Sequence, residues 1–153
     1  MSISREQQAL LIQAAIEAKQ GAYAPYSKFR VGAALLASDG SIIKGSNIEN
    51  ASYGGTICAE RTAIVKAVSE GTRSFIGLAV TTDVAATISP CGICRQVLRE
   101  FCPLKMPIFL VSAAYDPSQD SSTDEKKTLL ETTLEGLLPH SFGPEHLEIP
   151  RQG

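Results

Sequence analysis

Residues 29–45, FRVGAALLASDGSIIKG, place two apolar runs on either side of an Asp39-Gly40 pair. An Asp-Gly pair between such runs is a strong signal for the tight turn of a β-hairpin. We therefore predict a strand over 29–36, a turn at Asp39-Gly40 and a return strand over 41–45. The patterns on either side of this hairpin indicate the kind of sheet to which it belongs.

Helical and strand patterns alternate around the hairpin. Apolar residues at helical spacing predict an amphipathic helix over 5–19, which Gly21 follows. The downstream segments with comparable patterns are a helix over 59–68, a strand over 77–82, a helix from 90 to 99 or 100, a strand over 107–111 and a strand or short helix within 129–138. This order predicts an α/β domain around a mixed sheet, with helices on both faces.

The composition fits a single domain over 1–153, with a polar surface loop near 112–127 and an extended tail over 139–153. Lys and Arg number 14 against 16 Asp and Glu, and this net charge of −2 argues against a nucleic-acid partner. No apolar run reaches the ~18 residues of a membrane span, and residues 1–20 lack the apolar core of a signal peptide. We therefore expect a cytoplasmic protein with no membrane partner.

Cysteine spacing points to metal or redox chemistry. Cys91 and Cys94 form a C-x-x-C pair at a predicted helix start, with Ser89 expected to cap that helix and Pro90 to occupy its first position. Thiols at a helix N-terminus meet the positive end of the helix dipole, which favours their thiolates. On its own, the pair fits a redox dithiol, half of a structural zinc site or two packed thiols.

A third cysteine completes the number of ligands expected of a catalytic zinc site. Cys58 follows a Gly-Gly-Thr segment at another predicted helix start, so two abutting helix starts could aim three thiolates at one point. Zinc takes four ligands, and a catalytic site leaves one position for water. Cys102 has no partner at ligand spacing, and the two histidines lie in the tail. The other three cysteines therefore predict a zinc site with one open position.

Charged residues beside Cys58 favour catalysis over a structural role. Glu60 would destabilise a structural zinc site, whereas hydrolysis needs a carboxylate to move protons between water and substrate. Three thiolates around Zn²⁺ carry a net negative charge, which a nearby cation would offset. Arg61 is the best candidate because it lies on nearly the same helix face as Cys58, and Arg95 is the second.

These motifs resemble a known family. Cys-Ala-Glu at 58–60 followed by Pro-Cys-Gly-Ile-Cys at 90–94 resembles the signature of the zinc-dependent nucleoside and nucleotide deaminases. The first ligand is cysteine rather than histidine, and in this respect the sequence resembles the small cytidine deaminase branch of that family. The further segments that resemble this branch, in order, are 29–34, 45–53, 58–61, 90–96, 137–139 and 142–144. The resemblance extends over roughly residues 20 to 147.

The resemblance implies a three-layer α/β/α sandwich around a mixed five-stranded sheet, with one Zn²⁺ per subunit. It implies hydrolytic deamination of cytidine and 2′-deoxycytidine to uridine and 2′-deoxyuridine, with release of ammonia, in pyrimidine salvage. Glu60 would carry protons, and Ala59 and Glu60 would read the edge of the base. Asn47 and Glu49 would hold the ribose, and Phe29 would stack on the pyrimidine.

The resemblance also implies a homotetramer whose active sites are completed by neighbouring subunits. Tyr53 and Phe142 are then candidates to reach a neighbouring site, although Phe142 could instead anchor the tail on its own domain. The loop and the tail exceed the family's minimal pattern, so nothing is transferred to them.

Three other hypotheses remain at this point. The chain could deaminate a cytosine-bearing antibiotic nucleoside, although Phe29, Asn47 and Glu49 favour an ordinary nucleoside. It could act on a polynucleotide, against which the sequence pI of about 5.7 counts. It could also be a structural zinc or redox module, which leaves Glu60 unexplained.

Overall fold

The structure, a computed structural model, describes residues 3–119 and 127–153. In chain order, the helices and strands are α1 (Arg5–Lys19), β1 (Val31–Ala37), β2 (Ile42–Ser46), the 3₁₀ turn η1 (Tyr53–Gly55), α2 (Ala59–Ser69), β3 (Phe75–Thr82), α3 (Gly92–Phe101), β4 (Pro107–Val111), β5 (Leu129–Thr133), α4 (Leu134–Leu137) and the 3₁₀ turn η3 (Pro144–Glu148). The predicted alternation of helices and strands is confirmed.

The strands form one mixed five-stranded sheet in the order β2-β1-β3-β4-β5. Only β3 and β4 run parallel, and the other neighbouring pairs are antiparallel. The predicted hairpin is β1–β2, in which Leu36 lies opposite Ile42. Its turn contains Gly40 with φ 90°, a left-handed conformation that glycine adopts without strain.

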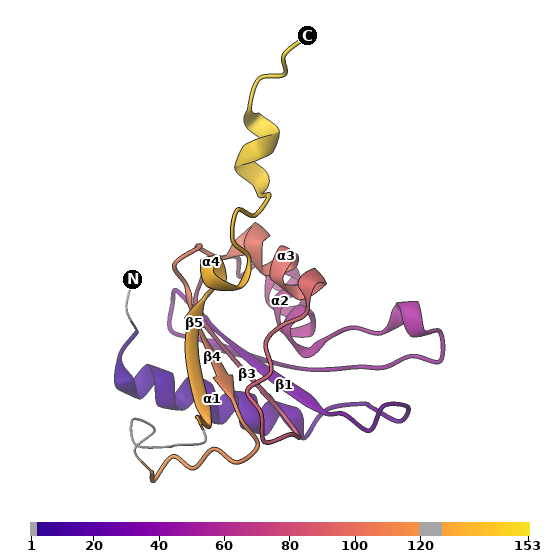
Figure 1. Cartoon of the computed structure of the whole chain (residues 1–153), viewed down its shortest axis with the longest axis vertical. Helices are drawn as coiled ribbons and strands as arrows, with labels where there is room; N and C mark the ends of the chain where they lie inside the picture. Colours follow the sequence, from indigo (N-terminus) through magenta and orange to yellow (C-terminus); the bar gives the residue numbers. More distant parts are fainter. Residues whose placement is uncertain (1–2, 120–126) are drawn as a thin grey trace.

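Helices cover both faces of the sheet (Figure 1), so the expected three-layer α/β/α sandwich is confirmed. Helix α1 buries Leu11 and Ala15 against Ala34 and Phe109 of the sheet. On the other face, α2 and α3 bury Ile64 and Leu98 in a second apolar cluster. This second face carries the starts of α2 and α3, where the cysteines lie.

Close packing of α2 on β2 positions one of these helix starts. A Cβ atom on Gly45 of β2 would lie 2.5 Å from both the Ala59 oxygen and the Ala63 nitrogen, closer than real contacts allow. Glycine therefore lets the α2 backbone lie directly on the strand. Because Ala59 is the first residue of α2, this contact fixes the height of the helix start above the sheet.

The start of α3 differs from the prediction. Cys91 is the N-cap residue and the helix begins at Gly92, so Ser89 does not cap it and Pro90 does not occupy its first position. The Ser89 hydroxyl instead accepts a hydrogen bond from Arg95 Nη2 at 2.8 Å. Arg95 Nε also donates to the Pro90 carbonyl oxygen at 2.7 Å, so this arginine organises the segment that precedes the helix.

The C-terminal part of the chain contains more regular structure than the sequence predicted. Residues 129–138 form a strand and then a short helix rather than one or the other. The tail includes η3, which was not predicted. Part of the predicted polar loop, residues 120–126, lies outside the described residues.

Two segments stand away from the body of the molecule in Figure 1: the loop between β2 and α2, in magenta, and the tail, in yellow. Each exposes aromatic surface, since Tyr53 in the loop is 75% exposed and Phe142 in the tail is 56% exposed. Helix α3 anchors the base of the tail, because Gln96 Nε2 donates to the Phe142 oxygen and buried Arg99 contacts Ser141.

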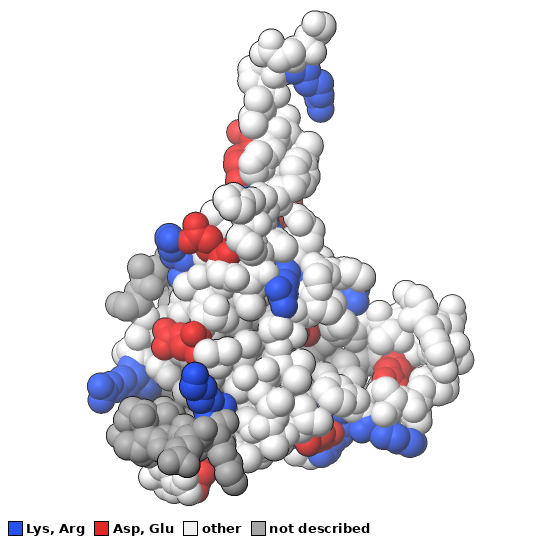
Figure 2. Space-filling model, in the orientation of Figure 1, with Lys and Arg blue, Asp and Glu red and all other residues white. Residues whose placement is uncertain are grey.

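The surface carries charges of both signs. On the face in Figure 2, Lys and Arg side chains are separated from one another and interspersed with Asp and Glu, without a continuous basic track. Within the described parts of the chain, no helix has the length and apolar character needed to span a membrane.

Candidate active site

The starts of α2 and α3 bring three thiols together. Cys58 and Cys91 are the N-cap residues of the two helices, and Cys94 lies in the first turn of α3. All three sulfurs lie within 4.8 Å of one another, with 3.8 Å between Cys58 and Cys91. A tetrahedral zinc centre with Zn–S bonds of about 2.3 Å separates its sulfurs by about 3.8 Å. The donor set therefore fits zinc in both softness and spacing.

Cys102 lies apart from this cluster. It follows the last turn of α3 and is buried among apolar residues. Burial raises the pKa of its thiol to about 12, so it stays protonated. Among the described residues, only the other three cysteines form a group able to hold a metal ion.

The cluster is electrostatically asymmetric. The Cys94 and Cys91 sulfurs lie within 4.8 Å of the Cys58 sulfur, and Arg61 Nη2 lies 3.6 Å from the Cys58 sulfur. These contacts lower the pKa of Cys58 to about 5. The contact with Cys58, together with burial, raises the pKa of Cys94. Arg61 therefore lies where a cation offsets thiolate charge, whereas Arg95 is turned toward the backbone oxygens of Pro90 and Leu137.

Glu60 is buried beside the thiols. It occupies the first turn of α2, is 5% exposed and has Oε2 at 3.8 Å from Cys94 Sγ. Burial raises the pKa of its carboxyl group above the usual range. A buried carboxyl group beside the thiols is placed where it can accept and release a proton, as a general acid–base must.

One cavity of about 400 Å³ connects the thiols with the residues predicted to bind a nucleoside. Its lining residues are Ser27, Phe29, Val31, Asn47, Glu49, Thr56, Cys58, Glu60, Val80, Thr82, Ile88, Ser89 and Cys91. Phe29, Asn47 and Glu49 thus share a cavity with Glu60 and two of the three cysteines. Its volume is in the range of small-molecule sites.

Sequence reasoning missed part of this lining. Val80 and Thr82 belong to β3 and lie toward its carboxyl end, where ligands bind in sheets with parallel strands. The end of a predicted strand could have indicated them. Ile88 and Ser89 belong to the irregular segment before α3, for which the sequence pattern offers no comparable signal.

Asn47 and Glu49 are already bonded to their own chain. Asn47 Nδ2 donates to the Phe29 oxygen at 2.8 Å, and its Oδ1 accepts from the Val31 nitrogen at 2.9 Å. Glu49 Oε1 accepts from the backbone nitrogen atoms of Tyr26 and Ser27 at 2.9 and 3.1 Å. The two side chains therefore tie the segment before β1 to the segment after β2.

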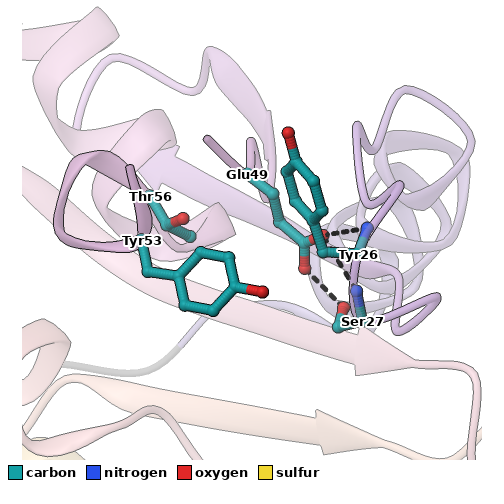
Figure 3. Close-up of a pocket in the computed structure, with 5 residues that line it drawn as sticks. All are labelled: Tyr26, Ser27, Glu49, Tyr53 and Thr56. Carbon is teal, nitrogen blue, oxygen red and sulfur yellow. Dashed lines mark hydrogen bonds between the residues drawn. The ribbon is translucent and has the colours of Figure 1, made fainter. Parts of the chain in front are cut away.

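Three residues predicted to contact substrate do not line the cavity of about 400 Å³: Ala59, Tyr53 and Phe142. Ala59 is fully buried and does not line this cavity. Tyr53 lines a neighbouring cavity of about 330 Å³ with Tyr26, Ser27, Glu49 and Thr56 (Figure 3). Phe142 stacks on His146 in the tail, with ring centroids 5.5 Å apart, and lines neither cavity.

Together, the fold and the site define a class of protein. Three thiols at two helix starts, with a buried carboxyl group beside them and a cavity in front, form a metal-assisted hydrolytic centre on an α/β/α sandwich.

Comparison with known proteins places the chain within this class. The family described as "Cytidine and deoxycytidylate deaminase zinc-binding region" matches residues 5–110. A cytidine deaminase of Halalkalibacterium halodurans is 48% identical over 138 residues, which cover 90% of this chain and 96% of that protein. One from Sporosarcina psychrophila is 51% identical over 137 residues, covering 90% and 92%.

Solved structures agree. The crystal structure of cytidine deaminase from Burkholderia pseudomallei superposes with a TM-score of 0.77 at 39% identity, covering 92% of this chain and 100% of that chain. The chain belongs to the cytidine and deoxycytidylate deaminase family. It is an enzyme of that family and its cofactor is zinc.

Proposed function

We propose that the chain catalyses hydrolytic deamination of cytidine and 2′-deoxycytidine to uridine and 2′-deoxyuridine, with release of ammonia, in pyrimidine salvage. The observation that carries this proposal is one cavity that is lined by buried Glu60, by Cys58 and Cys91 of the thiol cluster, and by Phe29, Asn47 and Glu49. The two relatives named above are cytidine deaminases, and this chain matches them over nearly their whole length, which supports the same activity here.

Cys58, Cys91 and Cys94 would hold the zinc ion, which when bound would act as a Lewis acid and make water a nucleophile near neutral pH. Glu60 accepts a proton from the attacking water at a carboxylate oxygen and transfers it to N3 of the base. A second transfer carries the new hydroxyl proton to the amino group on C4, which departs as ammonia while a C4 carbonyl forms. Burial of Glu60 keeps these transfers away from bulk solvent.

The cavity walls suit a nucleoside. Phe29 offers an apolar face on which a pyrimidine can stack. Glu49 has its pKa lowered by the hydrogen bond from Ser27, so it remains an ionised acceptor for a sugar hydroxyl. Asn47 keeps one amide hydrogen free to donate once its bond to Phe29 is made. The family resemblance assigns the Ala59 backbone to the edge of the base, and the Ala59 N–H, in the first turn of α2, has no acceptor within its own helix.

Arg61 completes the charge balance in this proposal. Three thiolates and Zn²⁺ carry a formal charge of −1, which weakens the pull of the metal on its water. Arg61 reduces this excess because its guanidinium group lies 3.6 Å from the Cys58 sulfur.

We further propose a cytoplasmic homotetramer whose sites are completed by neighbours. Tyr53 and Phe142 are exposed on the two protruding segments, where they can reach another subunit (Figure 1). Arg61 Nε is buried and has no partner within residues 3–119 and 127–153, and a neighbouring subunit could supply an acceptor. None of the four cysteines forms a disulfide, which suits the reducing cytoplasm.

Substitution Glu60→Gln tests the proposed mechanism. The amide cannot take up the proton of the attacking water, so kcat for cytidine should fall at least ~10²-fold while zinc stays bound. The measurements are loss of cytidine absorbance in the ultraviolet and elemental analysis. Exposed Glu70, at the end of the same helix, provides the matched control Glu70→Gln, which should retain activity. Near-normal turnover of the Glu60 variant would contradict the mechanism, and a wild-type protein unable to deaminate cytidine would contradict the proposed function.

A further inference from the structure

The Ser27 hydroxyl group links Glu49 and Phe29, two residues that line the cavity of about 400 Å³. Ser27 Oγ donates to Glu49 Oε2 and accepts a hydrogen bond from the Phe29 backbone nitrogen at 3.0 Å. The other oxygen of Glu49 accepts from the Tyr26 and Ser27 nitrogen atoms (Figure 3). One carboxylate thus holds the 26–29 turn at three points, and the third of these extends the contact to Phe29.

This turn needs such contacts because its backbone is unfavourable. Lys28 has φ 59°, in the left-handed region that residues other than glycine rarely adopt. The Lys28 side chain is exposed, so packing does not hold it in this conformation. Non-glycine residues in this region persist where surrounding contacts hold them, and such residues cluster at functional sites.

The turn lies where the two cavities meet. Ser27 and Glu49 line both the cavity of about 400 Å³, which contains Glu60, and the neighbouring cavity of about 330 Å³. Phe29 lines the larger one. The position of the Ser27 hydroxyl group therefore influences both Glu49 and Phe29 in the larger cavity.

We propose that Ser27 is a positioning residue, which aligns the Glu49 carboxylate and the Phe29 ring for the nucleoside by bridging the two. The inference rests on the proposed function and adds a residue to which no role in the site was assigned from the sequence. An ionised carboxylate only accepts hydrogen bonds, and three donors of the turn already bond to Glu49, which leaves little more than one acceptor site free. Glu49 is thereby held ready for a hydroxyl donor on the sugar.

Three variants test the role of the hydroxyl group. Ser27→Ala removes it, and Ser27→Thr keeps it. Ser41→Ala is the matched control, because the Ser41 hydroxyl donates to the Asp39 carboxylate at 2.6 Å in the β1–β2 turn, outside both cavities. In Ser27→Ala, KM for cytidine should rise about tenfold, as expected for losing one charge-assisted hydrogen bond, while kcat and zinc content change little.

Ser27→Thr should restore KM to within about threefold of the wild-type value, and Ser41→Ala should leave it unchanged. If Ser27 acts through Glu49, then Ser27→Ala in a Glu49→Gln background should add less than about threefold to KM. Full additivity of the two effects, failure of threonine to restore KM, or an equal effect of Ser41→Ala would overturn the proposal.

Amide hydrogen exchange separates this inference from the proposed function. Ser27→Ala should speed exchange over residues 26–29 at least about tenfold, whatever reaction the enzyme catalyses. Unchanged exchange would overturn the bridge itself. Faster exchange with an unchanged KM would overturn its role toward substrate. If the wild-type enzyme fails to deaminate cytidine, the proposed function falls, and the exchange result still decides whether the bridge holds the turn.

Discussion

Substitution Gly45→Ala should damage both stability and catalysis, because β2 and α2 leave no space for a methyl group. The added Cβ would lie 2.5 Å from the Ala59 oxygen and the Ala63 nitrogen, whereas ordinary contact begins near 3.4 Å. The shortfall is about 0.9 Å against two backbone atoms, which cannot rotate aside as a side chain can. Helix α2 must therefore move about 1 Å away from the sheet.

The cost follows from what α2 buries. Ala63, Ile64 and Ala67 are at most 1% exposed in the core beneath the helix, and lifting it loosens all three. Overpacking of this kind costs about 3 kcal/mol, which lowers Tm by roughly 6–12 °C in a chain of this size. Glu60 lies in the first turn of α2, and a misplacement of about 1 Å there can reduce kcat/KM about 10²-fold.

Thermal unfolding and cytidine turnover, both at saturating zinc, measure these two effects. Turnover is compared at a temperature well below both values of Tm, so that each protein is folded. Gly92→Ala is the control, because Gly92 lies between two of the zinc-binding cysteines and a Cβ there would meet no atom within 4 Å. A Gly45→Ala variant with Tm within about 1 °C of wild type and full turnover would refute the close packing of α2 on β2.

Three further outcomes are expected. Elemental analysis should find full zinc in Cys102→Ala and a loss of zinc in Cys91→Ala, because only the latter residue belongs to the thiol cluster; zinc loss in the former would contradict the ligand set. Arg61→Gln should lower both zinc retention and turnover, and Cys58→His should partly rescue it by removing one negative charge, whereas additive losses in the double variant would argue against charge compensation. Hydrogen bonds from Arg30 lower the pKa of Asp83 to about 2. Asp83 therefore contributes stability that is present above about pH 4 and is lost as the pH falls toward 2. Asp83→Asn should therefore lower the free energy of unfolding by about 1 kcal/mol at pH 7, after allowance for solvent screening. Denaturant unfolding measures this difference between wild type and variant, and a difference that stays constant down to pH 2 would exclude the Asp83–Arg30 ion pair as its source.

The sequence by itself determined most of the helices and strands and the two halves of the thiol cluster, because these depend on local patterns. The Asp39-Gly40 pair predicted the hairpin through the backbone conformation that the turn requires. The C-x-x-C spacing placed Cys91 and Cys94 at the start of one helix, and an offset of three residues placed Arg61 beside Cys58. Each of these inferences involves neighbours within one turn or one hairpin.

Only the tertiary structure decided which side chains share the cavity. Arg61 and Arg95 both follow zinc-type cysteines closely, yet Arg95 bonds to the Leu137 oxygen, which belongs to a segment far along the chain. The hydrogen bond from Ser27 to Glu49 likewise joins residues 22 positions apart. Neither contact follows from local periodicity, because its partner depends on how the strands are ordered and how closely the helices pack on them.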